Sequence, residues 1–265
     1  MKQLSTAKPI AGKAYGSIPH LGGSRKNDGK DRDLTPGQTK QLLESPPANH
    51  YVYVAEKLDG SCVAVAKLYN GLIVPLTRSG YRASSSPYAQ HRVFHQWVMD
   101  NLQMFDTMLN LGERIVGEWL LQAHGLLYKL DAPPFVPFDI FLQNKGRAKY
   151  LYTYSKAQEA GLKYPAILSY GKPLTIEQAM DMLDSNYASF TTFPVVEGRR
   201  EGAVWRLESA HLDKAGNSCK FLAKYVRPDF EPGKYLPNLS GKDAVYNEGY
   251  QDWLSPTALS MMESI

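Results

Sequence analysis

Lys57 is the residue whose setting in the sequence points most directly to chemistry. It ends the apolar, β-branched run YVYVAEK at residues 51–57, and Asp59-Gly60 follows almost at once. An amine held at a strand end and partly desolvated has a depressed pKa and can act as a nucleophile, and the turn would leave space for a ligand. The same residues also fit a plain β-hairpin with an Asp-Gly turn. This stretch alone leaves both interpretations open.

Charged residues recur at the ends or edges of other predicted strands. Each of them alone could be a solvated strand end. Together they would line a cleft that mixes cations with carboxylates, and such a cleft suits a polyphosphate and a divalent metal. The residues are Lys57, Asp59, Arg78, Glu118, Glu201 and Lys224.

Short strands with helices inserted between them would position these side chains. β-branched and aromatic runs bounded by turn residues predict the strands, and the Asp-Gly and Asn-Gly turns that join the first three predict a β-meander. Prolines confine the fifth strand to a sheet edge or a strand start. The predicted strands are 51–57, 62–69, 72–77, 113–120, 134–142, 201–209 and 219–227, the last two as a closing pair.

Three segments carry helical patterns. A short helix is expected near 36–44, and a helix at 175–185 begins with a Thr175–Gln178 capping box. Between them, apolar residues at 93, 94, 97, 98, 102 and 105 predict a single amphipathic helix with Pro87 in its first turn. The Pro/Gly-rich tail beyond the last strand is expected to be loop-like. Because strands and helices do not alternate regularly, the pattern predicts the α+β class with antiparallel sheets.

The composition excludes several classes of protein. With 43% apolar and 21% charged residues, the 265-residue chain is typical of a soluble globular protein. No apolar run reaches the roughly 18 residues of a membrane span, and the N-terminus lacks a secretory signal, so we expect a cytoplasmic protein without a membrane partner. Cys62 and Cys219 are expected to be buried, reduced thiols without a disulfide. His91 and His95 are expected to be a surface or half-buried helical pair rather than metal ligands.

The formal net charge of +4 is concentrated in residues 1–50, which carry eight Lys and Arg against four Asp and Glu. This segment has little periodicity, so we expect a largely irregular extension that packs on the core. Its stretch LGGSRKNDGKDRD fits phosphate contacts and a solvated arm equally well. The sequence contains no phosphate-binding glycine loop, dinucleotide fingerprint, serine elbow or H-E-x-x-H zinc motif.

Six short stretches resemble, in order, motifs I, Ia, III, IIIa, IV and V of the covalent nucleotidyltransferases. They are EKLDGS, RSG, GEWL, FDIF, EGAVWR and FLAKYVR, spread over residues 56–227. That superfamily contains the ATP-dependent DNA and RNA ligases and the mRNA-capping guanylyltransferases. The stretches IPHLGGSR and SSPYAQH further resemble a group of RNA ligase family proteins common in bacteriophages and bacteria.

The resemblance implies a nucleotidyltransferase domain at 51–240, built from two antiparallel sheets flanked by helices. Residues 1–50 would be the extension that packs on it, and 241–265 a tail. Only 38 residues (265 minus 227) follow Arg227, too few for the five-stranded oligonucleotide-binding (OB) barrel of DNA ligases and capping enzymes. No C-terminal OB domain is therefore expected.

The resemblance also implies three chemical steps. Lys57 would attack the α-phosphate of ATP and form a lysyl-AMP, with Mg²⁺ or Mn²⁺ as the metal. The AMP would pass to the 5′-phosphate of an RNA strand, and a 3′-hydroxyl would then displace AMP and seal the break. Lys224 and the metal would lower the pKa of Lys57 and neutralise the phosphate.

One role falls to each remaining candidate by the same resemblance. Glu56 would hold the purine edge, Phe138 would stack on the adenine, and Glu118 would bind the ribose hydroxyls. Arg78 would contact the ribose or the acceptor 5′-phosphate. Glu201 would bind metal, and Asp59 would shape the site and position metal-bound water.

Motif V departs from the family pattern. The family often has K-x-K there, whereas this chain has Lys220 and Lys224. Strand alternation would put both lysines on one face, so we expect Lys224 at the phosphate and Lys220 at the rim of the ATP site. Arg227 would point to the other face.

The predicted function is therefore that of an ATP-dependent RNA ligase that acts on RNA ends. We expect it to act in the cytoplasm, which would be that of the host if the protein is encoded by a phage. A minimal ATP-dependent DNA ligase is the alternative within the class. Two further alternatives are a nucleic-acid-binding protein that kept the fold without ligation and a nucleotidyltransferase that modifies a protein or small molecule. The joint presence of Lys57, Glu118, Glu201 and Lys224 favours chemistry over binding alone.

Overall fold

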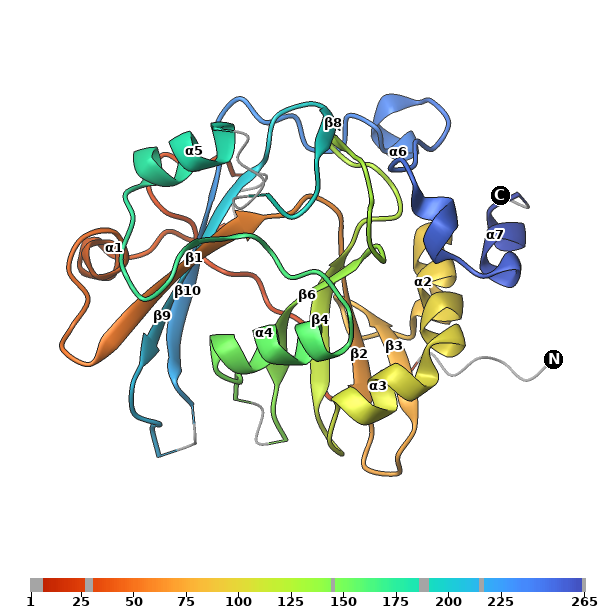
Figure 1. Ribbon diagram of the computed structural model, residues 1–265, viewed down its shortest axis with the longest axis horizontal. Coiled ribbons are helices and arrows are strands. Elements are labelled where there is room, and N and C mark those ends of the chain that lie inside the picture. Colours follow the sequence, from red (N-terminus) through yellow and green to blue (C-terminus); the bar gives the residue numbers. More distant parts are fainter. Residues whose placement is uncertain (1–6, 27–30, 144–145, 186–190, 215–216, 264–265) are drawn as a thin grey trace.

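Two four-stranded antiparallel sheets form the centre of the molecule (Figure 1). The structure is a computed structural model that describes residues 7–26, 31–143, 146–185, 191–214 and 217–263. The first sheet has the order β10 (Cys219–Val226), β9 (Gly202–Ser209), β1 (His50–Lys57) and β7 (Ile167–Ser169); the second has the order β3 (Ile73–Thr77), β2 (Ser61–Lys67), β4 (Arg114–Trp119) and β6 (Phe135–Phe141). The α+β class and the antiparallel sheets are confirmed. β5 (Leu127–Tyr128) and β8 (Val195–Glu197) form a separate small pair.

The chain passes from the first sheet to the second immediately after Lys57. β1 pairs with β7 and β9, whereas β2 pairs with β3 and β4. The predicted meander and the alternative Asp-Gly hairpin are therefore wrong at 58–60, although β2 and β3 do form a hairpin. Gly60 is required at this crossing because a Cβ there would lie 2.7 Å from the carbonyl oxygen of Trp119. The crossing places Lys57 at the boundary of the two sheets.

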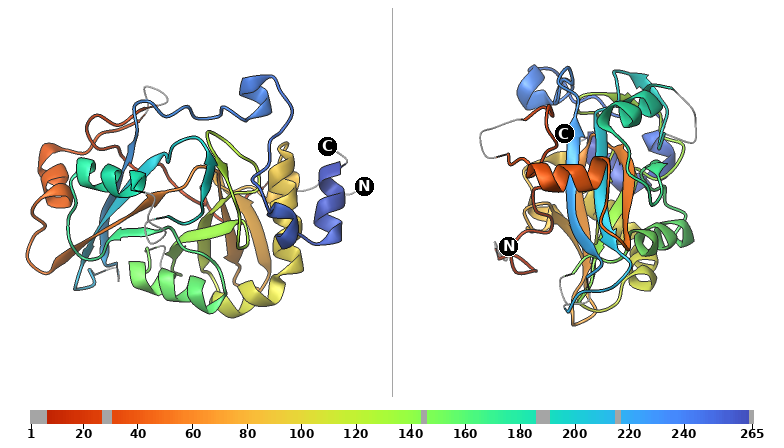
Figure 2. Two further views of the ribbon diagram at one scale, coloured as in Figure 1. Left: turned by 45° about the horizontal axis from the view of Figure 1, so that its top comes forward. Right: turned by 90° about the vertical axis from the view of Figure 1, so that its left-hand side faces the viewer.

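Helices cover the outer faces of both sheets (Figures 1 and 2). α1 (Pro36–Leu43) and α5 (Ile176–Asp184) pack on the first sheet through a core that includes Leu42, Leu183 and Trp205. α2 (Ala89–Asp100), α3 (Leu102–Met108) and α4 (Tyr150–Glu159) close a second core around Trp97 and Trp119. The capping box predicted at Thr175 is present.

Two helical predictions need correction. The single amphipathic helix is two helices, because α2 ends before Asn101 and α3 begins after it; Pro87 lies before the N-cap, Tyr88. The tail is also more than a loop. It contains α6 (Pro237–Ser240), a 3₁₀ turn η3 (Tyr250–Trp253) and α7 (Pro256–Glu263), and Leu254 and Ala258 join the core that also contains the inner face of α2.

The described residues after β10 form these short helical elements and isolated bridges, and no five-stranded barrel. A second 3₁₀ turn, η1 (Ala83–Ser85), precedes α2. Within the described ranges, no helix has the length and apolar character needed to span a bilayer. Cys62 and Cys219 are free, half-buried thiols.

Residues 14–25, here called the crossing segment, connect the two sheets on the side opposite the helices of the second core. At one end, the backbone amides of Ala14 and Tyr15 donate to the carbonyl of Arg78 at the end of β3. At the other end, Leu21 donates to the carbonyl of Lys224, whose own amide donates to Pro19. The crossing segment thus adds to the edge strand β10 and lies across the space between the sheets.

Candidate active site

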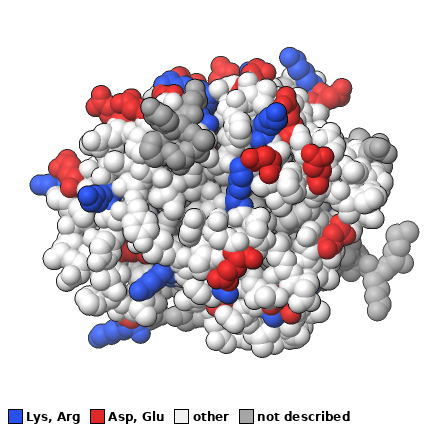
Figure 3. Space-filling view, viewed as in Figure 1, with Lys and Arg blue, Asp and Glu red and all other residues white. Residues whose placement is uncertain are grey.

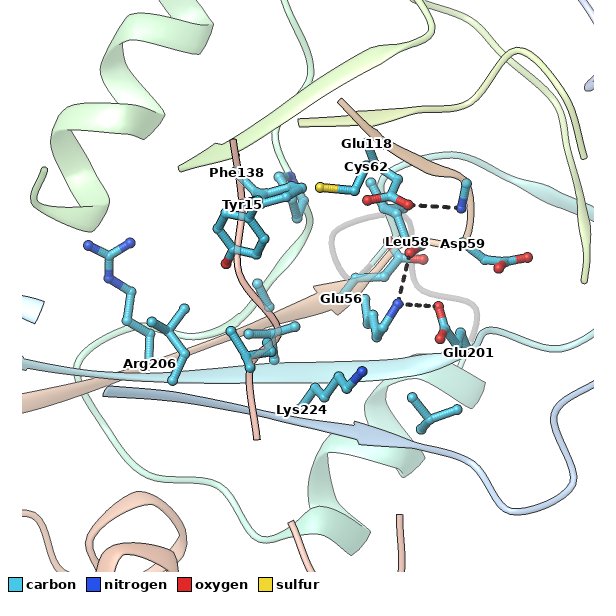
Figure 4. A pocket seen from close by; sticks show the side chains of 18 of the residues that line it. Tyr15, Glu56, Leu58, Asp59, Cys62, Glu118, Phe138, Glu201, Arg206 and Lys224 are labelled. Carbon is cyan, nitrogen blue, oxygen red and sulfur yellow. Dashed lines mark hydrogen bonds and ion pairs between the residues drawn. The ribbon is translucent and has the colours of Figure 1, made fainter. Parts of the chain in front are cut away.

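A cavity of about 480 Å³ lies between the two sheets and under the crossing segment. Residues from both sheets line it (Figure 4). Eight of the nine side chains predicted from the sequence lie on its wall: Glu56, Lys57, Asp59, Arg78, Glu118, Phe138, Glu201 and Lys224. Residues that are far apart in the sequence therefore meet in one place.

Lys57 and Glu201 form an ion pair in the middle of this cavity. The Nζ of Lys57 lies 2.6 Å from Oε2 of Glu201, and the dashed line to Glu201 in Figure 4 marks this contact. The pair forms because Lys57 is in register with Gly202 of β9, the residue after Glu201. At Gly202 a Cβ would lie 1.9 Å from the carbonyl oxygen of Tyr225, so only glycine lets β9 and β10 approach beside the site.

The pKa of Lys57 is raised, not depressed as the sequence suggested. Burial lowers the pKa of this ammonium, but the carboxylates of Glu201 and Glu118 outweigh that effect. The sequence-based expectation counted desolvation and neighbouring cations and did not place a carboxylate in direct contact. Without a ligand, Lys57 is therefore a protonated amine held by Glu201.

The two acidic residues beside Lys57 have pKa values near neutrality. Burial raises the pKa of Glu118 to about 8, and the ammonium of Lys57 only partly offsets this. Burial likewise raises the pKa of Glu201 to about 7 against the opposing effect of Lys57. Oε1 of Glu118 also accepts a hydrogen bond of 3.1 Å from the amide of Gly60. Both groups can therefore exchange protons at the pH of a cell.

The carboxylate of Glu56 is already satisfied by the protein. Its Oε2 accepts hydrogen bonds of 2.7 Å from both the amide and the hydroxyl of Thr192, and its Oε1 lies 3.2 Å from Nε of Arg200. Burial raises the pKa of this carboxyl. The side chain thus fixes the segment that leads into Glu201. The amide of Glu56 donates to the carbonyl of Ala166 at 2.9 Å, so neither the side chain nor the amide is available for the predicted contact with a purine edge.

The carboxylate of Asp59 is also hydrogen-bonded within the protein. Its Oδ2 accepts a hydrogen bond of 2.6 Å from the amide of Gly125, and its own amide donates to the hydroxyl of Tyr128. In Figure 4 its carboxylate points away from Glu201. The predicted metal role of Asp59 does not fit this geometry, whereas the predicted role in shaping the turn does. Among the described residues, no group of three or more His, Cys, Asp and Glu side chains could hold a metal.

One end of the cavity is aromatic and carries a buried cation (Figure 4). The ring of Phe138 meets Tyr15 edge to face, with centroids 5.2 Å apart. Arg206 is buried between Asp139 of β6, at 3.2 Å, and Glu208, at 2.7 Å. The Arg206–Asp139 contact therefore joins the two sheets at this end.

Lys224 extends from β10 into the cavity (Figure 4). Burial, and then the neighbouring ammonium of Lys57, lower the pKa of Lys224. Arg78 contributes a second cation, whose Nη2 donates to the hydroxyl of Ser17 at 3.1 Å. The cavity thus has cations on both of its long walls.

Lys220 lies outside the cavity and is exposed, so its predicted place at the rim is wrong. The pairing of β10 with β9 shifts between Cys219 and Phe221, and this bulge breaks the alternation on which the prediction relied. Arg227 is on the other face, as alternation predicted, where Nη2 contacts Asp184 at 2.8 Å.

Sequence reasoning missed many of the residues that line the cavity, among them four polar or aromatic ones from two segments. Arg206 could have been found, because it closes the EGAVWR motif and alternates with Gly202 and Val204 along one strand. Tyr15, His20 and Arg25 come from the crossing segment, whose path the sequence pattern did not reveal.

His91 also lines the cavity. Its Nδ1 lies 2.7 Å from the hydroxyl of Ser86, and burial lowers its pKa to about 4, so the ring is neutral. Burial also lowers the pKa of His95.

Comparisons with known proteins bear on the fold and on the family. A family model described as RNA ligase matches residues 50–226, which is two thirds of the chain. No curated protein matches the chain. Among solved structures, an RNA ligase of Naegleria gruberi with PPi is 18% identical over 91% of this chain and 64% of its own, with a TM-score of 0.51. This likeness shows a shared fold, that of the nucleotidyltransferases.

A second solved structure, an archaeal ATP-dependent RNA ligase, is 16% identical over 80% of this chain, with a TM-score of 0.45. The matches cover 48% of the archaeal ligase and 64% of the Naegleria ligase. The chain thus spans between about half and two thirds of the length of these relatives.

Proposed function

The chain belongs to the RNA ligase family, and from this premise we propose that it is an ATP-dependent RNA ligase that works through a covalent lysyl-AMP. One observation carries the proposal. Lys57 stands in a cavity of nucleotide size between two sheets, with an acid in contact and a second lysine, Lys224, two strands away in the same sheet. Mere binding of nucleic acid would not need a lysine in contact with an acid whose pKa is near 7.

The first step transfers AMP from ATP to Lys57. The Nζ attacks the α-phosphorus, the bond to the bridging oxygen breaks, and pyrophosphate leaves. Lys57 must first lose a proton, and Glu201 is placed to receive it at 2.6 Å. Lys224, and Arg78 across the cavity, carry the positive charge that would offset the charge developing on the phosphate oxygens.

A divalent cation fits one corner of this site. The carboxylate of Glu201 faces the cavity, and oxygen ligands from ATP phosphates and water would complete a shell that one carboxylate cannot. When bound, Mg²⁺ or Mn²⁺ supplies positive charge that neutralises phosphate oxygens and weakens the hold of Glu201 on Lys57. This fit rests on Glu201 and excludes Asp59.

The adenosine part of ATP fits the other end. Phe138 offers a ring face for stacking, and base stacking on an aromatic side chain contributes about 1–3 kcal/mol. Glu118 stands between this end and Lys57 and can bind ribose hydroxyls, as a donor when protonated and as an acceptor when ionised. The carbonyl of Glu56 is the group left for the predicted contact with the purine edge, since its amide donates to Ala166.

Two further steps would seal a strand. The oxygen of an RNA 5′-phosphate attacks the phosphorus of the lysyl-AMP, the bond to Nζ breaks, and Nζ takes up a proton. A 3′-hydroxyl then loses its proton and attacks the 5′-phosphorus of the adenylated strand, and AMP leaves. Arg78 has no carboxylate partner among the described residues, so its charge is available for the incoming 5′-phosphate.

The surface does not by itself select RNA over DNA. On the face seen in Figure 3, Lys and Arg are interspersed with Asp and Glu, without a continuous basic stripe. RNA follows from the family, and the cytoplasmic location and a phage origin remain predictions from the sequence.

Strand joining tests the function. Nicked and single-stranded substrates with a 5′-phosphate, made in RNA and in DNA of equal sequence, are incubated with ATP and Mg²⁺. The proposal expects joined RNA with the wild type and none with Lys57→Ala. Joining of DNA in preference to RNA would make the chain a DNA ligase. Binding of both nucleic acids without joining or adenylylation would make it a binding protein of the same fold.

A further inference from the structure

The HLGGSR stretch at residues 20–25 is the part of the crossing segment that the proposed reaction does not yet use. It begins beside Lys224 and ends with Arg25, which also lines the cavity. Gly23 has a φ of +73° and turns the chain in open space, so Gly22 and Gly23 make a short exposed turn. The turn brings Ser24 and Arg25 back to β10.

Hydrogen bonds fasten both sides of this turn to β10. The amide of Arg25 donates to the carbonyl of Val226 at 2.9 Å, and the amide of Val226 donates to the hydroxyl of Ser24 at 2.9 Å. The same hydroxyl lies 2.7 Å from Nδ1 of His20, whose Nε2 lies 3.3 Å from Asp31. His20 is 1% exposed. The backbone of Arg25 is therefore held in place.

The position of Arg25 along β10 relates it to the rest of the site. Leu222, Lys224 and Val226 are opposite Arg206, Val204 and Gly202 of β9, in that order. Arg206 marks the aromatic end of the cavity and Gly202 follows Glu201, so Arg25 at Val226 lies at the opposite end. Two residues along a strand span about 7 Å, which places Arg25 roughly that far beyond Lys224.

The guanidinium of Arg25 is available for an anion. Among the described residues, its one side-chain hydrogen bond runs from Nη1 to the carbonyl of Pro228, at 3.4 Å, and its Nε is buried without a hydrogen-bond partner. Neighbouring Lys26 differs, since it is exposed, pairs with Asp33 at 2.6 Å and does not line the cavity. A buried, unsatisfied N–H on a cation is costly unless a ligand fills it.

We infer that the HLGGSR turn builds a phosphate subsite in which Arg25 binds a phosphate group next to the one at Lys57. The inference rests on the proposed function, because it assumes a nucleotide with its base at Phe138 and its α-phosphate at Lys57. Two groups of the same chemistry would reach the subsite in turn. They are the β,γ-phosphates of ATP in the first step and the 5′-phosphate of RNA in the second.

Three readouts on Arg25→Ala, with Lys26→Ala as the matched control, test the subsite. The first is binding of pyrophosphate to the ligand-free protein by calorimetry. The second is the single-turnover rate of adenylylation against ATP concentration. The third is the rate of AMP transfer from purified lysyl-AMP protein to a 5′-phosphorylated RNA. Thermal melting confirms that each variant is folded.

Arg25→Ala loses a charge-assisted hydrogen bond to phosphate. We therefore expect its pyrophosphate affinity, its adenylylation rate or its rate of AMP transfer to fall by about ten-fold or more. A loss in the first two readouts assigns the subsite to the ATP phosphates, and a loss in the third assigns it to the RNA phosphate. Arg25→Lys should recover part of the loss, because it retains the charge without the planar fork. Lys26→Ala should stay within about two-fold of the wild type.

The subsite is overturned if Arg25→Ala matches Lys26→Ala in all three readouts. Failure of the proposed function gives a different result. In that case the wild type forms no adenylate, and the pyrophosphate measurement alone still decides whether Arg25 binds phosphate. A pyrophosphate affinity that is unchanged in Arg25→Ala in such a protein would reject both proposals.

Discussion

The Nζ of Lys57 lies 2.6 Å from the carboxylate of Glu201, across the boundary at which the chain leaves one sheet for the other. This contact keeps the amine of Lys57, the proposed nucleophile, protonated until its proton is transferred to an acceptor or the charge of Glu201 is neutralised. It also places the proton acceptor within direct reach. The ion pair is therefore the resting state from which adenylylation would start.

The first prediction concerns the reactivity of Lys57 in the absence of nucleotide. Glu201→Gln removes the larger of the two carboxylate effects that together outweigh burial, so the pKa of Lys57 should fall below its value in the wild type. The rate of acylation of Lys57 by an amine-reactive reagent, followed by mass spectrometry against pH, reports this change. The acylation profile of the variant should move to lower pH. An unchanged profile would show that Glu201 does not control the amine, and exposed Lys214 serves as an internal control.

A second prediction concerns stability against pH. The pKa of Glu118 is raised to about 8 in the folded protein and is ordinary, about 4.3, in the unfolded chain. At pH values between these two pKa values, Glu118 is more protonated in the folded than in the unfolded state. The stability that Glu118 contributes is therefore lost as the pH rises through about 8. Glu118→Gln should remove that loss. Its free energy of unfolding should exceed that of the wild type by an amount that grows with pH, on the order of 1–3 kcal/mol.

Urea unfolding near pH 5, 7 and 9 measures this difference. The control is Glu177→Gln, because the side chain of Glu177 is exposed. Glu113 is less suitable, because its carboxylate accepts a hydrogen bond from the amide of Asn110. A difference between Glu118→Gln and the wild type that does not change with pH would contradict the raised pKa.

The third prediction separates the two lysines of β10. Lys224 lines the cavity, whereas Lys220 is exposed at a bulge outside it. Lys224→Ala should slow adenylylation by about 100-fold or more, as expected for loss of a charged transition-state contact. Lys220→Ala should remain within about two-fold of the wild type. Single-turnover formation of the adduct measures both, and equal effects would contradict the placement of these side chains.

The fourth prediction concerns the base. Phe138→Ala should weaken ATP binding by about ten-fold or more, since base stacking on an aromatic ring contributes about 1–3 kcal/mol. Calorimetry in the Lys57→Ala background avoids turnover during the titration. Phe138→Tyr, which keeps the ring, is the control. An affinity in Phe138→Ala equal to that of the control would show that the base binds elsewhere.

Much of the site could be predicted because apolar, β-branched runs in the sequence indicate where strands lie. Lys57 ends β1, and Glu118 and Lys224 lie near the ends of β4 and β10. The order of the motifs suggested their roles. What the sequence could not show is which strands pair. The step from one sheet to the other at 58–60 depends on packing of Gly60 against Trp119, which no local pattern encodes.

Contacts between distant segments account for the remaining errors. The sequence suggested a depressed pKa for Lys57 because it did not reveal that β1 and β9 bring Glu201 into contact. Alternation failed at Lys220 because a bulge adds one residue to β10. The crossing segment was expected only as an irregular extension, since its hydrogen bonds to Arg78 and Lys224 are set by the partners and not by its own periodicity.

The most direct test of the account is covalent labelling of Lys57 by ATP. Wild type and Lys57→Ala, each shown to be folded and free of bound AMP, are incubated with α-labelled ATP and Mg²⁺ and followed by denaturing gel, intact mass and peptide mapping. The account predicts one acid-labile AMP on Lys57 of the wild type and none on the variant. The absence of an adduct on the wild type, or an adduct that maps to another residue and persists in Lys57→Ala, would contradict it.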